Sequence, residues 1–205
     1  VYCGPSPTPT LVPVCDVYED FEGAFPPSGW TIQTSGYGNQ WDATDIQSFS
    51  GSFSAYSNFF AGDHDEWLIS PSVDLTQFTW PEFRFAWFAS YYWMVDPIDN
   101  ADLIVQISVD GGTSWTPLWS EHDYGEFSTW FWYQETISLE PYKTESDVKL
   151  AFQYVGNDAA PVFVDVVGVC ESDEPLVPVP ATGFTGLAFL LIVIGVITRR
   201  IQRKN

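Results

Sequence analysis

The chain is most constrained by a succession of short segments rich in branched and aromatic residues, with turn-forming residues between them. Many short strands without helices between them predict an all-β fold, which we expect to be a two-sheet antiparallel jelly-roll sandwich. Alternation is clearest in residues 102–109, where one face carries Leu103, Val105, Ile107 and Val109. The strands are expected at residues 17–21, 30–33, 66–70, 82–92, 102–109, 115–119, 132–137, 149–155 and 162–169.

One turn carries a recognisable motif, Ser108-x-Asp110-x-Gly112-x-x-Trp115. The motif matches the Asp-box of sialidase-type propellers, which repeat it in every blade, whereas this chain has a single copy. We therefore expect a structural hairpin, in which the Asp110 carboxylate caps turn amides and Trp115 packs beneath them.

Charge is distributed unevenly along the 205 residues, whose formal net charge is −20. All 27 acidic residues precede Pro178, where the cations are only Arg84, Lys143 and Lys149, so this part carries a formal charge of −24. Such a surface repels nucleic acid and anionic lipid headgroups, so we expect no nucleic-acid partner. The charge suits divalent cations, basic partners or solubility.

The last stretch of the chain predicts a membrane anchor. No side chain from Ala181 to Thr198 is charged, and a cluster of basic residues follows at once. We expect a single transmembrane helix at 181–198 and a basic cytoplasmic tail at 199–205, because cationic clusters stay on the cytoplasmic side. The anchor residues are expected to be Phe184, Leu187, Leu190, Leu191, Ile194, Arg199 and Arg200.

Proline-rich segments flank the strand-rich region. We expect an extended arm at 1–15, the sandwich at 16–170 and a stiff spacer at 171–180. The chain begins with Val1 rather than Met, which is consistent with removal of a secretory signal peptide.

The three cysteines, Cys3, Cys15 and Cys170, fit one disulfide and one spare thiol in an oxidising compartment. If the first and last strands pair antiparallel, Cys15 lies just before one and Cys170 just after the other. This arrangement favours a Cys15–Cys170 bridge, with a Cys3–Cys15 loop as the alternative.

The strand-rich region also contains an ordered set of motifs. They are Asp20-Phe21-Glu22, Phe25-Pro26-Pro27-Ser28-Gly29-Trp30, Gly51 with Ser54-Ala55, residues 66–75, residues 105–115 and residues 163–167. This order resembles the cleaved-adhesin or choice-of-anchor domains of bacterial surface proteins, which are similar to MAM domains. The resemblance covers roughly residues 16–170. It implies a jelly-roll fold, a surface location and a binding or structural role, and it implies no reaction.

The start of the tail, Val179-Pro180-Ala181-Thr182-Gly183, resembles the Leu-Pro-x-Thr-Gly sortase signal except for Val at its first position. We favour a tail that is retained as a transmembrane helix. The resemblance and the tail together predict a single-pass protein of the bacterial cell membrane, with its N-terminal domain periplasmic or extracellular.

Two acidic segments invite a metal hypothesis. Jelly rolls of this kind often hold a structural Ca²⁺ where the first and last strands meet, and oxygen ligands suit this hard cation. The candidate ligands are Glu19, Asp20, Glu22 and Asp165; alternatively, Glu22 and Asp165 simply bond turn amides. The segment Asp63-His64-Asp65-Glu66 lacks the spacing of a zinc site, and we interpret it as a solvated acidic loop.

Aromatic residues make up 18% of the chain, so some must lie outside the core. Phe83, Phe85 and Trp87 share one strand face and are expected in the core. Consecutive aromatic runs must expose some rings. A surface for a glycan or a partner protein is therefore expected at Tyr91, Tyr92, Trp93, Trp130 and Trp132.

The sequence contains no Gly-x-Ser-x-Gly elbow and no recognisable Cys–His pair, so we expect a protein that is not an enzyme. Our main hypothesis is a membrane-anchored structural accessory subunit of a larger membrane complex, contacting other membrane subunits. The alternative is a cell-surface adhesion module that binds glycan or protein. A glycan-active hydrolase is a distant third.

Overall fold

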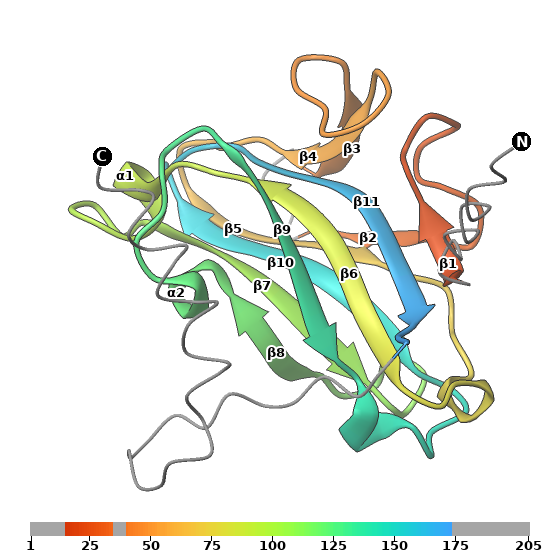
Figure 1. Ribbon diagram of the computed structural model, residues 1–205. Helices are drawn as coiled ribbons and strands as arrows, with labels where there is room; N and C mark the ends of the chain where they lie inside the picture. The colour runs from red at the N-terminus through yellow and green to blue at the C-terminus, as the bar shows by residue number, and fades with distance from the viewer. Residues whose placement is uncertain (1–14, 35–39, 174–205) are drawn as a thin grey trace, which may run out of the picture.

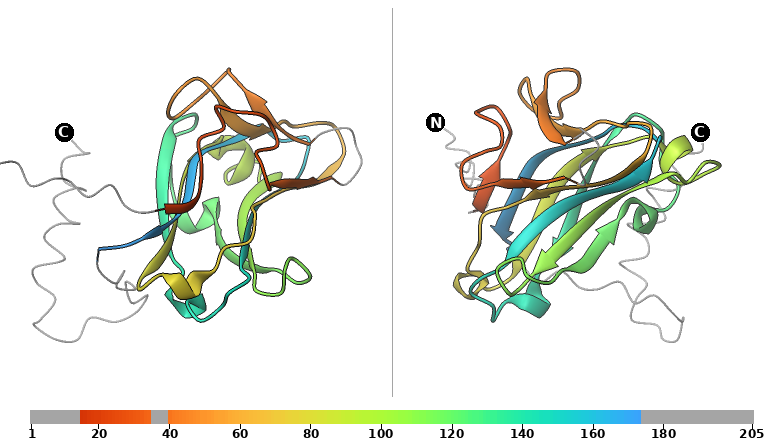
Figure 2. Two further views of the ribbon diagram at one scale, coloured as in Figure 1. Left: turned by 90° about the vertical axis from the view of Figure 1, so that its right-hand side faces the viewer. Right: turned by 180° about the vertical axis from the view of Figure 1, so that it is seen from behind.

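The computed structural model describes residues 15–34 and 40–173 and folds them into two antiparallel sheets packed face to face (Figure 1). Sheet A is six-stranded, in the order β3-β4-β11-β6-β9, with β1 also paired to β11. Sheet B is five-stranded, in the order β2-β5-β10-β7-β8. Figure 2 shows both layers from two further directions. The expected two-sheet antiparallel sandwich is thus confirmed.

The strands are short and regularly spaced. Their bounds are β1 Cys15–Glu19, β2 Thr31–Gln33, β3 Trp41–Thr44, β4 Ser54–Ser57, β5 Asp63–Ile69, β6 Pro81–Phe88, β7 Ala101–Ser108, β8 Thr116–Ser120, β9 Trp132–Ser138, β10 Lys149–Asn157 and β11 Val162–Glu171. The helices are η1 Leu75–Gln77, α1 Tyr91–Met94, α2 Glu121–Tyr124 and η2 Glu140–Tyr142.

All nine expected strands are present, with two differences from the prediction. The structure adds β3 and β4, and it ends the strand expected at 82–92 at Phe88. Residues 91–94 instead form the helical turn α1, in which the Met94 amide bonds the Ser90 carbonyl at 3.1 Å. Val109 lies just beyond β7 and is 43% exposed, so it is not on the buried face that we expected.

Aromatic rings fill the space between the sheets. Phe83, Phe85 and Trp87 on β6 are all buried, as their shared face predicts. Phe152 on β10 meets Phe83 and Phe85 with ring centroids 5.8 and 5.3 Å apart, which joins sheet B to sheet A. Trp41 on β3 is also fully buried and packs on Phe152.

The first and last strands meet at Cys15 and Cys170, which lie directly opposite each other in the β1–β11 ladder. Their sulfurs are joined in a disulfide, as preferred from the sequence. A Cβ added to Gly168 would lie 3.3 Å from the Cys170 sulfur, so a glycine leaves room for the bridge.

The Asp-box turn joins β7 to β8 and has the expected structural role. The Asp110 Oδ1 atom accepts hydrogen bonds from the Thr113 and Ser114 amides at 3.0 and 2.8 Å. The Ser114 hydroxyl donates to Oδ2 at 2.6 Å, and this bond is the largest reason why the pKa of Asp110 is held below its ordinary value. Trp115 then packs on Trp67 of β5, with ring centroids 5.3 Å apart.

Residues 1–14 and 174–205 lie outside the described part of the chain. They include most of the expected arm and spacer and all of the expected transmembrane helix with its anchor residues and the basic tail, whereas Cys15 and Glu171 are strand residues of β1 and β11. Among residues 15–34 and 40–173, no helix is long and apolar enough to cross a membrane. The membrane hypothesis therefore stays a prediction.

Candidate binding face

A row of aromatic side chains crosses the outer surface of sheet A. Phe163 on β11 lies opposite both Tyr56 on β4 and Phe88 on β6, and Phe88 lies opposite Trp132 on β9. Ring centroids along the row are 5.8, 5.4 and 5.3 Å apart. Because Trp87, the neighbour of Phe88, points into the core, alternation places this row on the outside. Four strands thus carry one continuous line of rings, in which Phe163 and Phe88 in the middle are buried and Tyr56 and Trp132 at the ends are partly exposed.

Two more rings extend the row at the β9 side. Phe49, from the loop between β3 and β4, packs on Trp132 at 5.9 Å, and Trp130 packs on Phe88 at 5.5 Å. Phe49 is 39% exposed and Trp130 is 41% exposed. Within the described residues, the Trp132 indole nitrogen has no hydrogen-bond partner. We call the set Phe49, Tyr56, Phe88, Trp130, Trp132 and Phe163 the aromatic face.

A groove with polar side chains in its lining continues the same outer surface along β6 and β9. On β6 the outward positions run from Phe88 to Arg84, and on β9 they run from Trp132 through Gln134 to Thr136. The groove has a volume of about 490 Å³, within the range of small-ligand sites. Its lining also includes Tyr18, Gly168 and the Cys15–Cys170 disulfide.

Two groups in the groove fix its electrostatics. The Arg84 guanidinium forms an ion pair with the buried Glu82 carboxylate. This pair holds the Arg84 side chain, which is partly exposed, in position. Burial, reinforced by nearby carboxylates, raises the pKa of the Tyr18 phenol above its ordinary value. Tyr18 therefore remains a neutral hydroxyl that can both donate and accept hydrogen bonds.

The structure separates the five aromatic residues predicted to form a surface. Trp130 and Trp132 both contact Phe88 and belong to the aromatic face. Tyr91, Tyr92 and Trp93 form the turn α1, where Tyr91 packs against the buried Phe127 at 5.1 Å. Tyr92 is 48% exposed and contacts Trp93. Tyr92 is thus an exposed ring on another element.

The other members of the aromatic face were not predicted from the sequence. Tyr56 and Phe163 lie 107 positions apart in the chain and meet only through the β4–β11 register. Phe49 reaches Trp132 from a loop that crosses the sheet. Only Phe88 could have been predicted, because strand alternation directs its side chain away from the core side on which the neighbouring Trp87 was expected.

The predicted calcium ligands Glu22 and Asp165 hold the loop of residues 45–53 over sheet A. Asp165 on β11 is fully buried, and its Oδ2 atom accepts hydrogen bonds from the Phe49 and Ser50 amides at 2.7 and 3.0 Å. Glu22 accepts bonds from the Ser52 and Phe53 amides, both at 2.7 Å. Burial raises the pKa of Asp165, and the nearby Glu22 charge adds to the effect. These carboxylates position Phe49 beside Trp132.

The other two predicted ligands serve the turn after β1. Glu19 accepts a bond from the Phe21 amide at 2.7 Å, and Asp20 accepts a longer one of 3.4 Å from the Glu22 amide. In the described residues, these carboxylates do not form a group of three with ligand atoms within 4.8 Å of one another. Their oxygens are chemically suited to Ca²⁺, but most already bind backbone amides. The calcium site stays a prediction.

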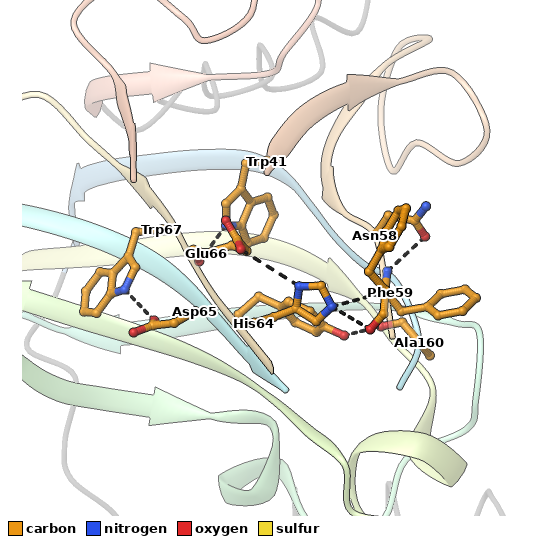
Figure 3. A network of polar contacts seen from close by, with 10 residues as sticks. Trp41, Asn58, Phe59, His64, Asp65, Glu66, Trp67 and Ala160 are labelled. Carbon is orange, nitrogen blue, oxygen red and sulfur yellow. Dashed lines mark hydrogen bonds and ion pairs between the residues drawn. The ribbon is translucent and has the colours of Figure 1, made fainter. Parts of the chain in front are cut away.

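The segment Asp63-His64-Asp65-Glu66 is not the solvated loop that we expected, because it begins strand β5 (Figure 3). Alternation buries His64 and Glu66 and exposes Asp63 and Asp65. The His64 Nδ1 atom lies 3.9 Å from Glu66 Oε1, and its Nε2 atom contacts the Phe60 backbone at 2.7 and 2.9 Å. The Trp41 indole donates to the Glu66 carbonyl at 3.0 Å. These contacts make the segment a polar part of the core.

Comparison with known proteins identifies related folds. No protein-family model and no curated protein matches this sequence. Among solved structures, the chain is similar to the K1 and K3 cleaved adhesin domains of Lys-gingipain from Porphyromonas gingivalis W83, each at 20% identity. The K1 match covers 76% of this chain and 97% of that domain with a TM-score of 0.57. The K3 match covers 78% and 99% with a TM-score of 0.59.

A carbohydrate-binding structure has a related fold. TmCBM61, solved in complex with β-1,4-galactotriose, matches at 13% identity and a TM-score of 0.51, covering 75% of this chain and 94% of that one. At these identities the likeness shows the fold. The chain therefore has the β-sandwich fold of cleaved adhesin domains, as the sequence motifs predict, and this fold also occurs in carbohydrate-binding modules.

Proposed function

We propose that this domain is a non-catalytic adhesion module that binds a glycan against the aromatic face of sheet A. The observation that carries the proposal is the in-register row of rings from Tyr56 to Trp132, whose two end rings are partly exposed and which adjoins a groove.

The chemistry of the face suits a carbohydrate. Sugar rings present C–H groups that pack on aromatic faces, and Trp130 and Trp132 supply such faces at the β9 side. Hydroxyl groups need donors and acceptors, which Tyr18, Arg84 and Gln134 supply along the groove. The strongly negative charge of the domain favours neutral sugars over anionic ones. The carbohydrate-binding structure that shares the fold supports the same class of ligand.

The test is a glycan array followed by calorimetric titration of the chain, with β-1,4-galactotriose as a defined first probe. We expect Trp132→Ala to weaken binding of the best array ligand at least tenfold, since central aromatic contacts are worth more than about 1–2 kcal/mol. Trp130→Ala should weaken it less, because Trp130 lies at the border of the face. Tyr92→Ala removes an exposed ring on α1 and is the matched control.

The proposal fails if no glycan binds, or if Trp132→Ala binds as tightly as the wild type while retaining its fold by circular dichroism. A protein ligand is then the second candidate. It is favoured by apolar rings without a polar atom, namely Phe59, Phe60 and Phe131, which are 43%, 51% and 63% exposed. Such surfaces commonly contact other proteins.

The proposal includes two expectations about the membrane, namely that the chain is anchored by a transmembrane helix and that it has partner subunits. A transmembrane helix at 181–198 would hold the binding face outside the bacterial cell membrane, and deletion of residues 181–205 should then release the protein from the membrane fraction. The accessory-subunit hypothesis predicts copurification with stoichiometric partners from detergent. Purification of the chain alone, with glycan binding intact, favours the adhesion module.

A further inference from the structure

At the end of the sandwich that carries α2, one imidazole is surrounded by carboxylates. His122 Nε2 lies 3.2 Å from Asp102 Oδ1, 3.4 Å from Asp99 Oδ1 and 3.8 Å from Glu121 Oε1. Ligand atoms of His122, Asp99 and Asp102 all lie within 4.8 Å of one another, the one such group in residues 15–34 and 40–173. This cluster has no role in the aromatic face.

Local structure fixes each member of the cluster. Asp99 and Asp102 flank the start of β7, and Glu121 and His122 open the helical turn α2, which lies beside β7 (Figure 1). A capping box between Ser120 and Asp123 sets the first turn of α2. The cluster is therefore built from regular structure on both sides.

Glu121 shows that the cluster is more than a surface ion pair. Its side chain is fully buried, and its Oε2 atom accepts a hydrogen bond from the Leu103 amide at 2.9 Å. Its other oxygen, Oε1, is also buried and has no hydrogen-bond partner among the described residues, although it points toward His122 Nε2. A buried carboxylate oxygen without a partner is costly unless a cation or proton completes it.

We propose that His122 Nε2, Asp99 and Asp102 form a site for a divalent cation of the zinc class, above the buried Glu121 carboxylate. Metal–ligand bonds of 2.0–2.2 Å in a tetrahedron separate neighbouring ligand atoms by about 3.3–3.6 Å. The distances from His122 Nε2 to the Asp99 and Asp102 oxygens, 3.4 and 3.2 Å, are close to this value. An imidazole ligand favours zinc over Ca²⁺ and Mg²⁺, which prefer oxygen ligands.

Exposure fits loading from solution. His122 and Asp102 have side chains 42% exposed and Asp99 62%, whereas Glu121 forms the buried floor. The cation would join the loop before β7 to α2. Tyr124 at the end of α2 packs on Tyr133 and on Trp87, which lies beneath the aromatic face. The cation would therefore hold α2, whose Tyr124 contacts sheet A, against the start of β7 in sheet B.

The test uses the full 205-residue chain, stripped with a chelator and titrated with Zn²⁺, Ca²⁺ or Mg²⁺ by calorimetry. We expect one Zn²⁺ per chain, at least tenfold weaker binding of Ca²⁺ and Mg²⁺, and a higher Tm with Zn²⁺. The chain has two histidines, so the ring resonances of His122 should shift with Zn²⁺ while those of the buried His64 stay in place. The titration is repeated in Cys3→Ser, since a spare thiol also binds zinc.

Substitutions distinguish zinc binding at this site from non-specific binding to the acidic surface. His122→Ala should abolish Zn²⁺ binding, and Asp102→Asn and Glu121→Gln should each weaken it at least tenfold with the fold retained by circular dichroism. Asp45→Asn, an exposed carboxylate elsewhere, should change nothing. Unchanged Zn²⁺ binding in His122→Ala, or unmoved His122 resonances in the wild type, overturns the site. So does loss of binding in Cys3→Ser.

Discussion

The outer surfaces of the two sheets differ in how their polar atoms are satisfied. On sheet B, Asp65 accepts hydrogen bonds from the Trp67 indole at 2.6 Å and from the Gln153 amide at 2.7 Å. The Gln106 amide continues the chain of bonds to Gln153 at 2.8 Å. These side chains alternate with buried residues on β5, β10 and β7, so they lie on the outer surface.

Among the residues that the structure describes, the aromatic face of sheet A has no comparable network. Its rings contact one another, and the Trp132 indole has no hydrogen-bond partner in the described part of the chain. Both sheets carry tryptophan outside, but sheet B uses Trp67 and its bonds to complete its own surface. The two sheets therefore differ because Trp67 on sheet B belongs to a polar network, whereas Trp132 on sheet A contacts other rings.

The largest expected effect concerns the disulfide, which supports sheet A alone. The double variant Cys15→Ser/Cys170→Ser should lower the free energy of unfolding by about 2–5 kcal/mol, because the bridge closes a loop with a sequence separation of 155. Urea unfolding with and without reductant measures the loss. An equal stability in both conditions would show that the β1–β11 ladder holds without the bridge.

The next effect separates the two tryptophans. Trp67→Ala should destabilise the domain by about 2 kcal/mol, less than a fully buried tryptophan, and should leave glycan affinity unchanged. Trp132→Ala should show the reverse pattern, with a large loss of affinity. Chemical denaturation and calorimetry on the same two proteins give the comparison. Loss of glycan binding in Trp67→Ala would move the binding face to sheet B.

A smaller effect concerns the loop that places Phe49 on sheet A. Asp165→Asn removes a buried acceptor of amide bonds and should cost about 1–3 kcal/mol. If the predicted calcium site forms, Ca²⁺ should raise the Tm of the wild type and leave Asp165→Asn unchanged. A Tm that is the same with Ca²⁺ and with a chelator leaves amide bonding as the whole role of Asp165 and Glu22.

The smallest effect belongs to the Asp-box turn on sheet B. The pKa of Asp110 in the folded protein lies below its ordinary value of 3.8. Its contribution to the free energy of unfolding is therefore fully present above that pH and is lost as the pH falls below it. The free energy of unfolding of Asp110→Asn should therefore decrease less than that of the wild type between neutral and strongly acidic pH. Urea titrations at a series of pH values test this, and parallel curves for both proteins would contradict it.

Much of the fold could be predicted because alternation and turn residues are local signals. The segment 102–109 and the Phe83, Phe85 and Trp87 face show this, as does the hairpin around Asp110. The strands β3 and β4 gave no such signal, because Trp41–Thr44 and Ser54–Ser57 are four residues long and rich in small or polar side chains.

The candidate sites were harder to predict because they depend on register. Phe163 meets Tyr56 and Phe88 only through two strand pairings. The same holds for Asp99 and His122, which are brought together by a helical turn of four residues. The prediction for His64 and Glu66 was wrong, because their polar segment was expected to be a solvated loop. Its place in sheet B buries both side chains instead.

The position of the disulfide also decides how the domain carries mechanical load. A pulling force that enters at Cys15 and leaves beyond Cys170 passes through one covalent link. The strands between the two cysteines lie outside this line of force, so tension along the chain does not peel them apart. The sandwich can therefore keep its aromatic face in shape while the segments on either side of it are under tension.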